Sequence, residues 1–220
     1  MLKNHKTKLV LFDLDGTLID TAPDFLYALN KILKKNDEDA ITEEEIRFHI
    51  SEGTSKMINT FFKIKQGDEN FKKYKNQFLS EYKLNLTRNS RLFDGMKSLI
   101  QYLDNNSIMY GVVTNKYYEY AEPILKSFTE LSNLKVIICP DHVSISKPDP
   151  EGILLACNKL DVSPDNTIYL GDHLNDLIAG KAAGTKVIGC LYGYSLEENI
   201  LKSHGYNYIN DVSEIISHID

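Results

Sequence analysis

Short runs of apolar residues alternate with longer segments of helical periodicity along most of the chain. Most of these runs are rich in Val, Ile and Leu, and several end at a polar residue or a glycine, which is the pattern of a buried parallel strand. Strands that alternate with helices at this spacing predict an α/β fold with a doubly wound, Rossmann-like parallel sheet. The predicted strands are Leu9–Phe12, Ile108–Val113, Lys135–Cys139, Thr167–Leu170, Val187–Cys190 and Tyr206–Ile209. The helices predicted between them are Met96–Leu103, Tyr120–Ser127, Pro150–Leu160 and Asp176–Ala183.

This alternation is interrupted once, after the first strand, by a long segment whose apolar residues recur at helical spacing. The segment lacks the strand and turn signals that surround it, so it reads as an insertion into the α/β pattern. We expect residues 1–20 and 89–220 to form the α/β core and residues 21–88 to form an inserted helical cap. The hinges of such a cap are expected near Asp20 and Arg88.

Helix-start signals divide the insertion into four predicted helices. Thr21 followed by Pro23 is typical of a first helical turn, and Thr42 with Glu45 forms the sequence of a capping box. A third helix is predicted after the break at Gly53, and a fourth from about Asn70 to Leu86. The apolar stripe of the fourth helix predicts a face buried in a helical bundle.

Composition narrows the classes of protein to which the chain can belong. It has 220 residues, a hydrophobic fraction of 42% and a net charge of −6, which fits a globular protein and not a clustered basic surface for nucleic acid. The apolar run before Asp13 is shorter than the roughly 7–15 residues of a secretory signal, and no stretch approaches the roughly 20 residues of a membrane span. We therefore expect a soluble, cytoplasmic protein without nucleic-acid or membrane partners. Reduced, buried thiols are expected at Cys139, Cys157 and Cys190.

The first predicted strand delivers two carboxylates to its C-terminal end. In extended chain, residues two apart point to the same side, so Asp13 and Asp15 converge. Two like charges at that distance need a cation or a shared proton to coexist. Gly16 follows and permits a turn that most residues resist. This pattern indicates a chemical site at the end of the strand.

Three later strand ends carry polar residues that suit the same site. Thr114 and Asn115 follow the second strand, Lys147 precedes a helix, and Asp172 and Asp176 follow the fourth strand. The carboxyl ends of parallel strands share one edge of a sheet, and open α/β sheets bind ligands there. The sequence therefore predicts a cluster of carboxylates with one lysine.

Four carboxylates and a lysine suit a hard divalent cation and a phosphate group. Magnesium prefers oxygen ligands and is commonly shared between carboxylates and substrate phosphates. The sequence has no cluster of histidines and cysteines of the kind that binds zinc. With the charge balanced, Asp13 is predicted to attack phosphorus as a nucleophile, and Asp15 to protonate the leaving alcohol and then activate water. Lys147, Thr114 and Asn115 are predicted to hold the phosphate oxygens.

These motifs resemble those of the haloacid dehalogenase-like superfamily of phosphatases over essentially the whole chain. The four matching segments are Phe12–Leu18, Val113–Asn115, Lys147-Pro148 and Gly171–Asp176. The resemblance implies that Asp13 is the nucleophile and Asp15 the acid and base. It also implies that magnesium is bound by Asp13, by the backbone carbonyl of Asp15 and by Asp172, with Asp176 behind these ligands. The helical insertion is similar to that superfamily's cap.

Finer features point to one branch of the superfamily. Asp20–Pro23, Thr114–Lys116 and Leu191–Tyr194 resemble the phosphoglycolate phosphatases, although Tyr117 stands where that branch usually has proline. Gly171–Gly180 also resembles the related N-acetylmuramic acid 6-phosphate phosphatases. The implied substrate is a small phosphorylated metabolite, and the sequence does not choose between these two esters or predict an oligomeric state. Haloacid dehalogenases proper lack an equivalent of Asp15, which argues against their chemistry.

Three other functions remain open at this point. A sugar phosphomutase uses the same nucleophile and returns the phosphoryl group to sugar, a phospho-aspartate switch changes partner binding, and an inactive module only binds. Asp15 and the helical insertion disfavour the switch, and the complete set of catalytic groups disfavours the inactive module. Arg47 and Ser55 are candidates for reading the leaving group, and His173 is a candidate for contact with the site.

Overall fold

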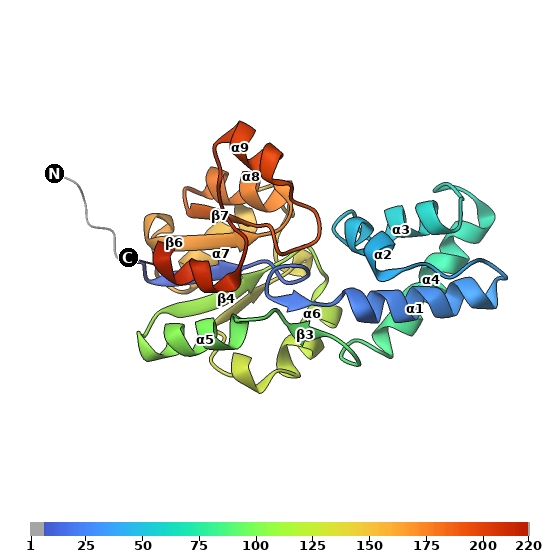
Figure 1. Cartoon of the computed structure of the whole chain (residues 1–220), viewed down its shortest axis with the longest axis horizontal. Coiled ribbons are helices and arrows are strands. Elements are labelled where there is room, and N and C mark those ends of the chain that lie inside the picture. Colours follow the sequence, from blue (N-terminus) through green and yellow to red (C-terminus); the bar gives the residue numbers. More distant parts are fainter. Residues whose placement is uncertain (1–6, 220) are drawn as a thin grey trace. The chain divides into compact units, whose positions relative to one another are not determined.

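The computed structural model describes residues 7–219 of the chain. The residues fall into two compact units, of which one takes in the chain up to Ile19 and again from Leu92, and the other runs from Asp20 to Arg91. Figure 1 colours both units along the chain and labels many of their elements. No helix in the described part is long and apolar enough to cross a membrane.

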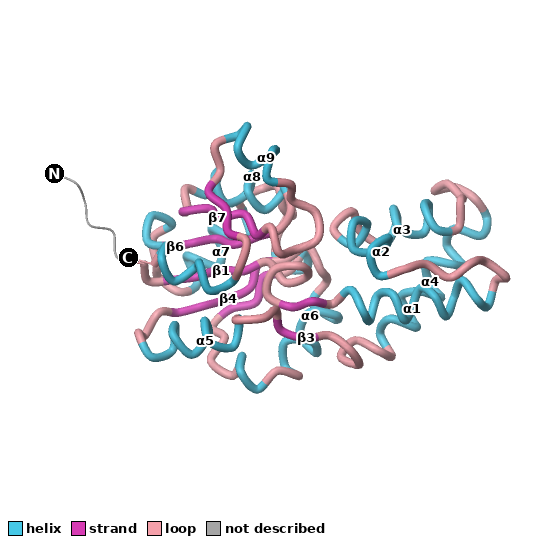
Figure 2. Tube along the Cα trace, in the orientation of Figure 1, coloured by secondary structure: helices cyan, strands magenta, loops and turns pink. Residues whose placement is uncertain are grey.

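The first unit is built on a parallel sheet of six strands in the order β5-β4-β1-β6-β7-β8. Figure 2 draws the strands in magenta. All neighbouring strands in this sheet pair in parallel, which confirms the predicted α/β, doubly wound fold. Each predicted strand has a counterpart with nearly the same bounds. These are β1 (Leu9–Phe12), β4 (Met109–Val113), β5 (Val136–Ile138), β6 (Thr167–Gly171), β7 (Lys186–Cys190) and β8 (Asn207–Ile209).

Helices connect these strands, as expected for parallel neighbours. They are α5 (Met96–Asn105), α6 (Tyr118–Lys126), α7 (Glu151–Lys159), α8 (Leu174–Ala183) and α9 (Glu198–His204). The predicted end of α8 at Gly184 is confirmed: this residue has a φ of 80°, the left-handed conformation that glycine adopts without a side-chain clash. The sequence did not predict α9, a short helix of 7 residues.

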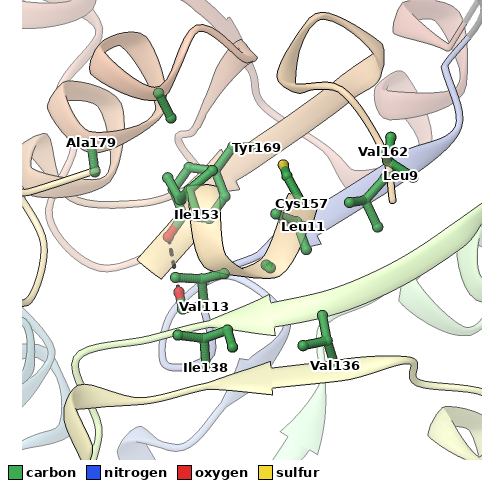
Figure 3. Close-up of a cluster of buried hydrophobic side chains, with 12 residues drawn as sticks. Leu9, Leu11, Val113, Val136, Ile138, Ile153, Cys157, Val162, Tyr169 and Ala179 are labelled. Atoms are coloured by element: carbon green, nitrogen blue, oxygen red, sulfur yellow. Dashed lines mark hydrogen bonds between the residues drawn. The ribbon is translucent and has the colours of Figure 1, made fainter. Parts of the chain in front are cut away.

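The buried core of this unit surrounds β1 and its neighbours. All four residues of β1 are fully buried, because strands covered on both faces have no solvent side. Figure 3 shows part of this core, where Leu9 and Leu11 lie among side chains from β4, β5, β6 and α7. The three cysteines are free and buried, as predicted. This rigid sheet sets the position of every residue that follows its strands.

The second unit is a bundle of helices α1 (Ala22–Lys35), α2 (Glu43–Ile50), α3 (Thr54–Phe61) and α4 (Glu69–Lys83). The capping box at Thr42 is present, with hydrogen bonds in both directions to Glu45. The predicted stripe of α4 packs inside the bundle, where Phe78 and Tyr82 stack with Phe25 of α1. Helix α4 ends before Leu84 and therefore stops short of the predicted Leu86.

Short strands β2 (Ile19–Asp20) and β3 (Arg91–Leu92) pair where the chain passes between the units. Buried Asp20 accepts hydrogen bonds from Arg47 at 2.8 Å and from Arg91 at 3.0 Å. Buried Asp24 accepts bonds from the backbone N–H of Asn89 and from that of Ser90. These bonds tie the returning segment to α1, and this compact unit runs to Arg91. The hinges expected near Asp20 and Arg88 stay predictions. The role of this bundle as a cap stays a prediction.

Candidate active site

Three strands of the sheet end at one edge, and each is followed directly by a side chain that the sequence marked. Asp13 follows β1, Thr114 follows β4, and Asp172 follows β6. The parallel register holds these ends level, since Phe12 pairs with Val112 on one side and Leu170 on the other. The backbone N–H of Asp13 donates to the Leu170 carbonyl at 2.8 Å. All the predicted catalytic residues lie within this one compact unit.

Lys147 lies at the centre of a buried hydrogen-bond network. Its Nζ donates to Asp13 Oδ1 at 2.8 Å and to Asp176 Oδ1 at 2.6 Å, and it lies 2.9 Å from the Tyr169 hydroxyl. Burial acts to lower the pKa of Lys147, but the charges of Asp13 and Asp176 outweigh it and raise the pKa above its usual value. The lysine therefore stays charged and balances part of the negative charge of the site.

Tyr169 is a residue of the site that sequence reasoning missed. Its hydroxyl donates to the Val113 carbonyl at 2.9 Å, a bond drawn in Figure 3, and accepts from Lys147. The side chain is fully buried in β6, where its hydroxyl joins the end of β4 to the lysine. A polar tip inside an otherwise apolar strand was the available signal, since buried Tyr hydroxyls need a partner.

Asp172 is fully buried and accepts hydrogen bonds on both carboxylate oxygens. Thr17 Oγ1 donates to Oδ1 at 3.0 Å, and the Tyr194 backbone N–H donates to Oδ2 at 2.9 Å. The Ser195 hydroxyl donates to the backbone carbonyl of Asp172 at 2.7 Å. The turn after β1 and the loop after β7 therefore fix this carboxylate in one orientation.

Two glycines allow that close packing around Asp172. Gly16 has a φ of 84°, and a Cβ placed on it would lie 2.3 Å from Asp172 Oδ2. A Cβ on Gly193 would lie 2.3 Å from Asp172 Cβ and 2.5 Å from the Gly16 carbonyl oxygen. All three distances are far below van der Waals contact, so a side chain at either glycine would displace the Asp172 carboxylate. Gly16 was singled out from the sequence for its turn, and the structure adds this second reason.

Asp13, Asp172 and Asp176 bring carboxylate oxygens within 4.8 Å of one another. Burial raises the pKa of Asp172 well above its usual value, with further contributions from the charges of Asp13 and Asp176. Burial also raises the pKa of Asp13, although Lys147 opposes the shift. Three clustered carboxylates thus face one ammonium group, and the remaining negative charge fits a hard cation with oxygen ligands.

Within this cluster, Asp176 also accepts hydrogen bonds on both carboxylate oxygens. Its Oδ1 accepts from Lys147, and its Oδ2 accepts from the His173 backbone N–H at 3.0 Å. This bond is half of a capping box that opens α8, and in the other half His173 Nδ1 accepts from Asn175 N–H at 3.1 Å. His173 is therefore used as a helix cap. The arrangement suits the predicted place of Asp176 behind the metal ligands.

Asp15 is held by a lysine that the sequence did not mark as a site residue. Lys116 Nζ donates to Asp15 Oδ1 at 3.0 Å and to Oδ2 at 3.1 Å. The backbone N–H of Lys116 donates to Thr114 Oγ1 at 3.1 Å. Lys116 follows Thr114 and Asn115 in the chain, so its place beside two predicted site residues was the available signal.

Asn115 ties two loops of the site together through its side-chain amide. Its Nδ2 donates to the Lys147 carbonyl at 2.9 Å, and its Oδ1 accepts from the Lys147 N–H at 3.1 Å. This pair fixes the loop that carries Lys147 against the end of β4. Thr114 is buried beside it. The contacts of Thr114, Asn115 and Lys147 with phosphate oxygens stay predictions, and the structure adds a supporting role for Asn115.

We expect Asp172→Asn to make the metal-free protein more stable at neutral pH, by on the order of 1 kcal/mol. The raised pKa of Asp172 means that the folded protein binds more protons than the unfolded chain above the usual value of 3.8. The contribution of Asp172 to stability is then greatest at low pH and falls as pH rises toward the raised pKa. Asn removes this titration and flattens the fall. Urea unfolding in EDTA at several pH values measures both effects.

The matched control for this measurement is Asp165→Asn, because Asp165 is an exposed carboxylate that precedes β6, whereas Asp172 follows the other end of that strand. It is expected to leave the pH dependence unchanged. A steeper loss of stability with pH in Asp172→Asn than in the unmodified protein would contradict the prediction.

The chain is similar to known proteins over most of its length. A family model described as haloacid dehalogenase-like hydrolase matches residues 10–190. The N-acetylmuramic acid 6-phosphate phosphatase of Pseudomonas putida is 36% identical over 206 residues, covering 94% of this chain and 92% of that protein. The phosphoglycolate phosphatase of Xanthomonas campestris is 33% identical over 190 residues, covering 86% of each.

A solved structure shares the fold over nearly its full length. It is the crystal structure of a predicted phosphoglycolate phosphatase from Haemophilus somnus, with a TM-score of 0.85 and 27% sequence identity. The match covers 97% of this chain and 98% of that one. These similarities agree with the resemblance that the four sequence segments indicated.

Proposed function

The chain belongs to the haloacid dehalogenase-like hydrolase family, and from this premise we propose that it hydrolyses a small phosphomonoester with magnesium as cofactor and Asp13 as nucleophile. The phosphatase activity is supported by relatives named as phosphatases that cover most of the chain. The observation that carries the residue assignment is the convergence of Asp13, Asp172 and Lys147 at one edge of the sheet. The cytoplasmic location expected from the sequence stays a prediction.

In the first step of the proposed reaction, an oxygen of Asp13 attacks phosphorus and the bond from phosphorus to the leaving oxygen breaks. Lys147 holds Asp13 from one side at 2.8 Å, and the backbone bond from Asp13 N–H to Leu170 fixes the start of the turn. Asp15 gives a proton to the leaving alcohol. The product of this step is a phosphorylated Asp13.

In the second step, water attacks the phosphorus and Asp13 leaves as a carboxylate. Asp15 accepts the proton of that water, which restores the acid for the next turnover. Splitting one displacement into two steps lets the same pair of carboxylates serve both halves of the reaction. Thr114 and Lys147 are proposed to contact the phosphate oxygens, which gain negative charge as the bonds change.

The proposed magnesium ion would be held by the side chains of Asp13 and Asp172 and by the backbone carbonyl of Asp15. The donor set fits such an ion because it consists of oxygens and carries more negative charge than Lys147 balances. When bound, magnesium supplies positive charge that lets a phosphate dianion approach a carboxylate. Asp176 would act through its contact with Lys147 and its cap of α8.

Phosphate release from an aryl phosphate tests the proposed activity directly. We expect turnover with magnesium, loss of at least about 100-fold on addition of EDTA, and recovery when magnesium is restored in excess. Unchanged turnover in EDTA would contradict the metal assignment. With a sugar 1-phosphate as substrate, isomerisation without phosphate release would indicate a phosphomutase instead.

The substrate is best tested by side-by-side kcat/KM values for N-acetylmuramic acid 6-phosphate and phosphoglycolate. The named relative with 36% identity acts on the first ester and the one with 33% identity on the second. We expect one ester to exceed the other by about tenfold or more, because groups outside the phosphate site contribute binding energy to the reaction. Equal, low values for both would indicate another ester.

A further inference from the structure

We propose that Lys116 is a positioning residue that holds the Asp15 carboxylate ready to accept the proton of water in the second step of the reaction. This inference rests on the proposed phosphatase function and adds a residue that the four sequence segments do not assign. It follows from the geometry of one ion pair, from its burial, and from the way the loop after β4 is anchored.

The ion pair is made in a defined geometry. One ammonium group contacts both oxygens of one carboxylate, at 3.0 and 3.1 Å. Two bonds to one carboxylate restrict its rotation, whereas a single bond leaves it free to turn. The orientation of Asp15 therefore depends on where Lys116 Nζ lies.

Burial distinguishes this pair from the surface ion pairs of the protein. The Lys116 side chain is 6% exposed and that of Asp15 is 16% exposed. Lys97, by contrast, pairs with Glu130 while its side chain is 63% exposed, and pairs of that kind contribute little because water competes for both groups. A buried lysine side chain loses its rotamer freedom when the protein folds, so holding its partner in place costs no further conformational entropy.

The base of Lys116 is anchored by the catalytic loop itself. Its backbone N–H is bonded to Thr114 Oγ1, and the neighbouring Asn115 is bonded twice to the backbone of Lys147. Lys116 is therefore joined by hydrogen bonds to the same loops that carry Thr114 and Lys147, the residues proposed to contact phosphate. This coupling keeps Asp15 in register with the phosphate group on Asp13.

Asp15 serves in both steps, as the proton donor in the first and as the proton acceptor in the second. Lys116 contacts both of its carboxylate oxygens. In the second step the oxygen of water bonds to phosphorus, the bond from phosphorus to Asp13 breaks, and the proton of water passes to the Asp15 carboxylate. A carboxylate held by an ammonium group is the reactant of this second step.

The test uses an aryl phosphate with a nitrophenolate leaving group, which departs without needing a proton. Its first step therefore does not report on Asp15, and its second step does. In Lys116→Met, mixed rapidly with this substrate and magnesium, we expect the first equivalent of nitrophenolate to appear at least as fast as the unmodified enzyme turns over. Later turnovers should be slower by about 10–100-fold, because a misplaced catalytic group costs about that much.

Lys116→Arg is the conservative variant, because a guanidinium also donates two bonds to one carboxylate. If Lys116→Met lowers the steady-state rate by a given number of powers of ten, Lys116→Arg is expected to recover at least about half of that number. Lys97→Met is the matched control from a surface ion pair and is expected to match the unmodified enzyme in both phases. Thermal unfolding of each variant checks that it is folded. If Lys116→Met does not fold, Lys116→Gln replaces it in the same measurement.

Two results would overturn this proposal. One is a Lys116→Met enzyme with unchanged later turnovers, and the other is an enzyme that slows equally from the first equivalent and is not improved by arginine. Failure of the proposed function looks different, since in that case the unmodified enzyme itself releases no phosphate from any ester.

Discussion

Asp13→Asn is expected to reduce kcat by about 10⁴-fold or more while leaving the protein folded, as is usual when a nucleophile is removed. The amide oxygen of Asn can still accept from Lys147, which lies 2.8 Å from Asp13 Oδ1. It lacks the charge and nucleophilicity of a carboxylate, so no bond to phosphorus forms. The removal of one of three clustered carboxylates also reduces their repulsion.

The measurement is kcat on an aryl phosphate with magnesium, together with thermal unfolding of the same preparation. The unfolding temperature should be equal to or above that of the unmodified protein. Asp165→Asn, a change of the same chemistry at an exposed position, is expected to retain full activity. Full activity in Asp13→Asn would refute the nucleophile assignment.

Lys147→Met is expected to lower the free energy of unfolding by about 3–5 kcal/mol, the usual cost of removing one partner from a buried ion pair. The Lys147 side chain is 4% exposed and contacts Asp13 and Asp176. Without its charge, two buried carboxylates face each other with no positive group from the protein between them. Methionine keeps much of the volume of lysine, so the loss reports on charge and hydrogen bonds more than on packing.

A double variant separates these contributions. Asp176→Asn removes one of the two stranded charges, so Lys147→Met with Asp176→Asn should be more stable than Lys147→Met alone. Urea unfolding in EDTA measures all three. Lys31→Met, which removes a surface pair with Glu81 in which the lysine is 55% exposed, should cost less than about 1 kcal/mol. Equal losses from Lys31→Met and Lys147→Met would contradict the role given to Lys147.

Local pattern predicted most elements of the fold, although not α9 or the short strands β2 and β3. The run Leu9–Phe12 predicted β1 with its observed bounds, because a strand covered on both faces has no polar position. Thr42 and Glu45 predicted the start of α2, because the capping box is made by residues three apart. The same reasoning placed the end of α4 at Leu86, although the helix ends before Leu84, because no strong stop signal marks that residue.

Contacts between distant segments were beyond the reach of that reasoning. Tyr169 reads as one more core residue until β4 and β6 bring Val113 and Lys147 against its hydroxyl. Lys116 follows two predicted site residues in the chain, but its partner Asp15 is 101 residues away and is brought to it only by the turn after β1. The loop at Gly193 was marked only by resemblance, and its close approach to Asp172 is visible only in the structure.

By itself, the sequence determined the α/β fold, the helical insertion and the strand ends that Asp13, Thr114 and Asp172 follow. Periodicity and turn chemistry act between near neighbours in the chain, and parallel strands necessarily share one carboxyl edge. Only the tertiary structure decided which lysine holds which carboxylate, Lys147 on Asp13 and Lys116 on Asp15. That choice depends on a few ångströms between residues a hundred positions apart, and no local pattern encodes such a distance.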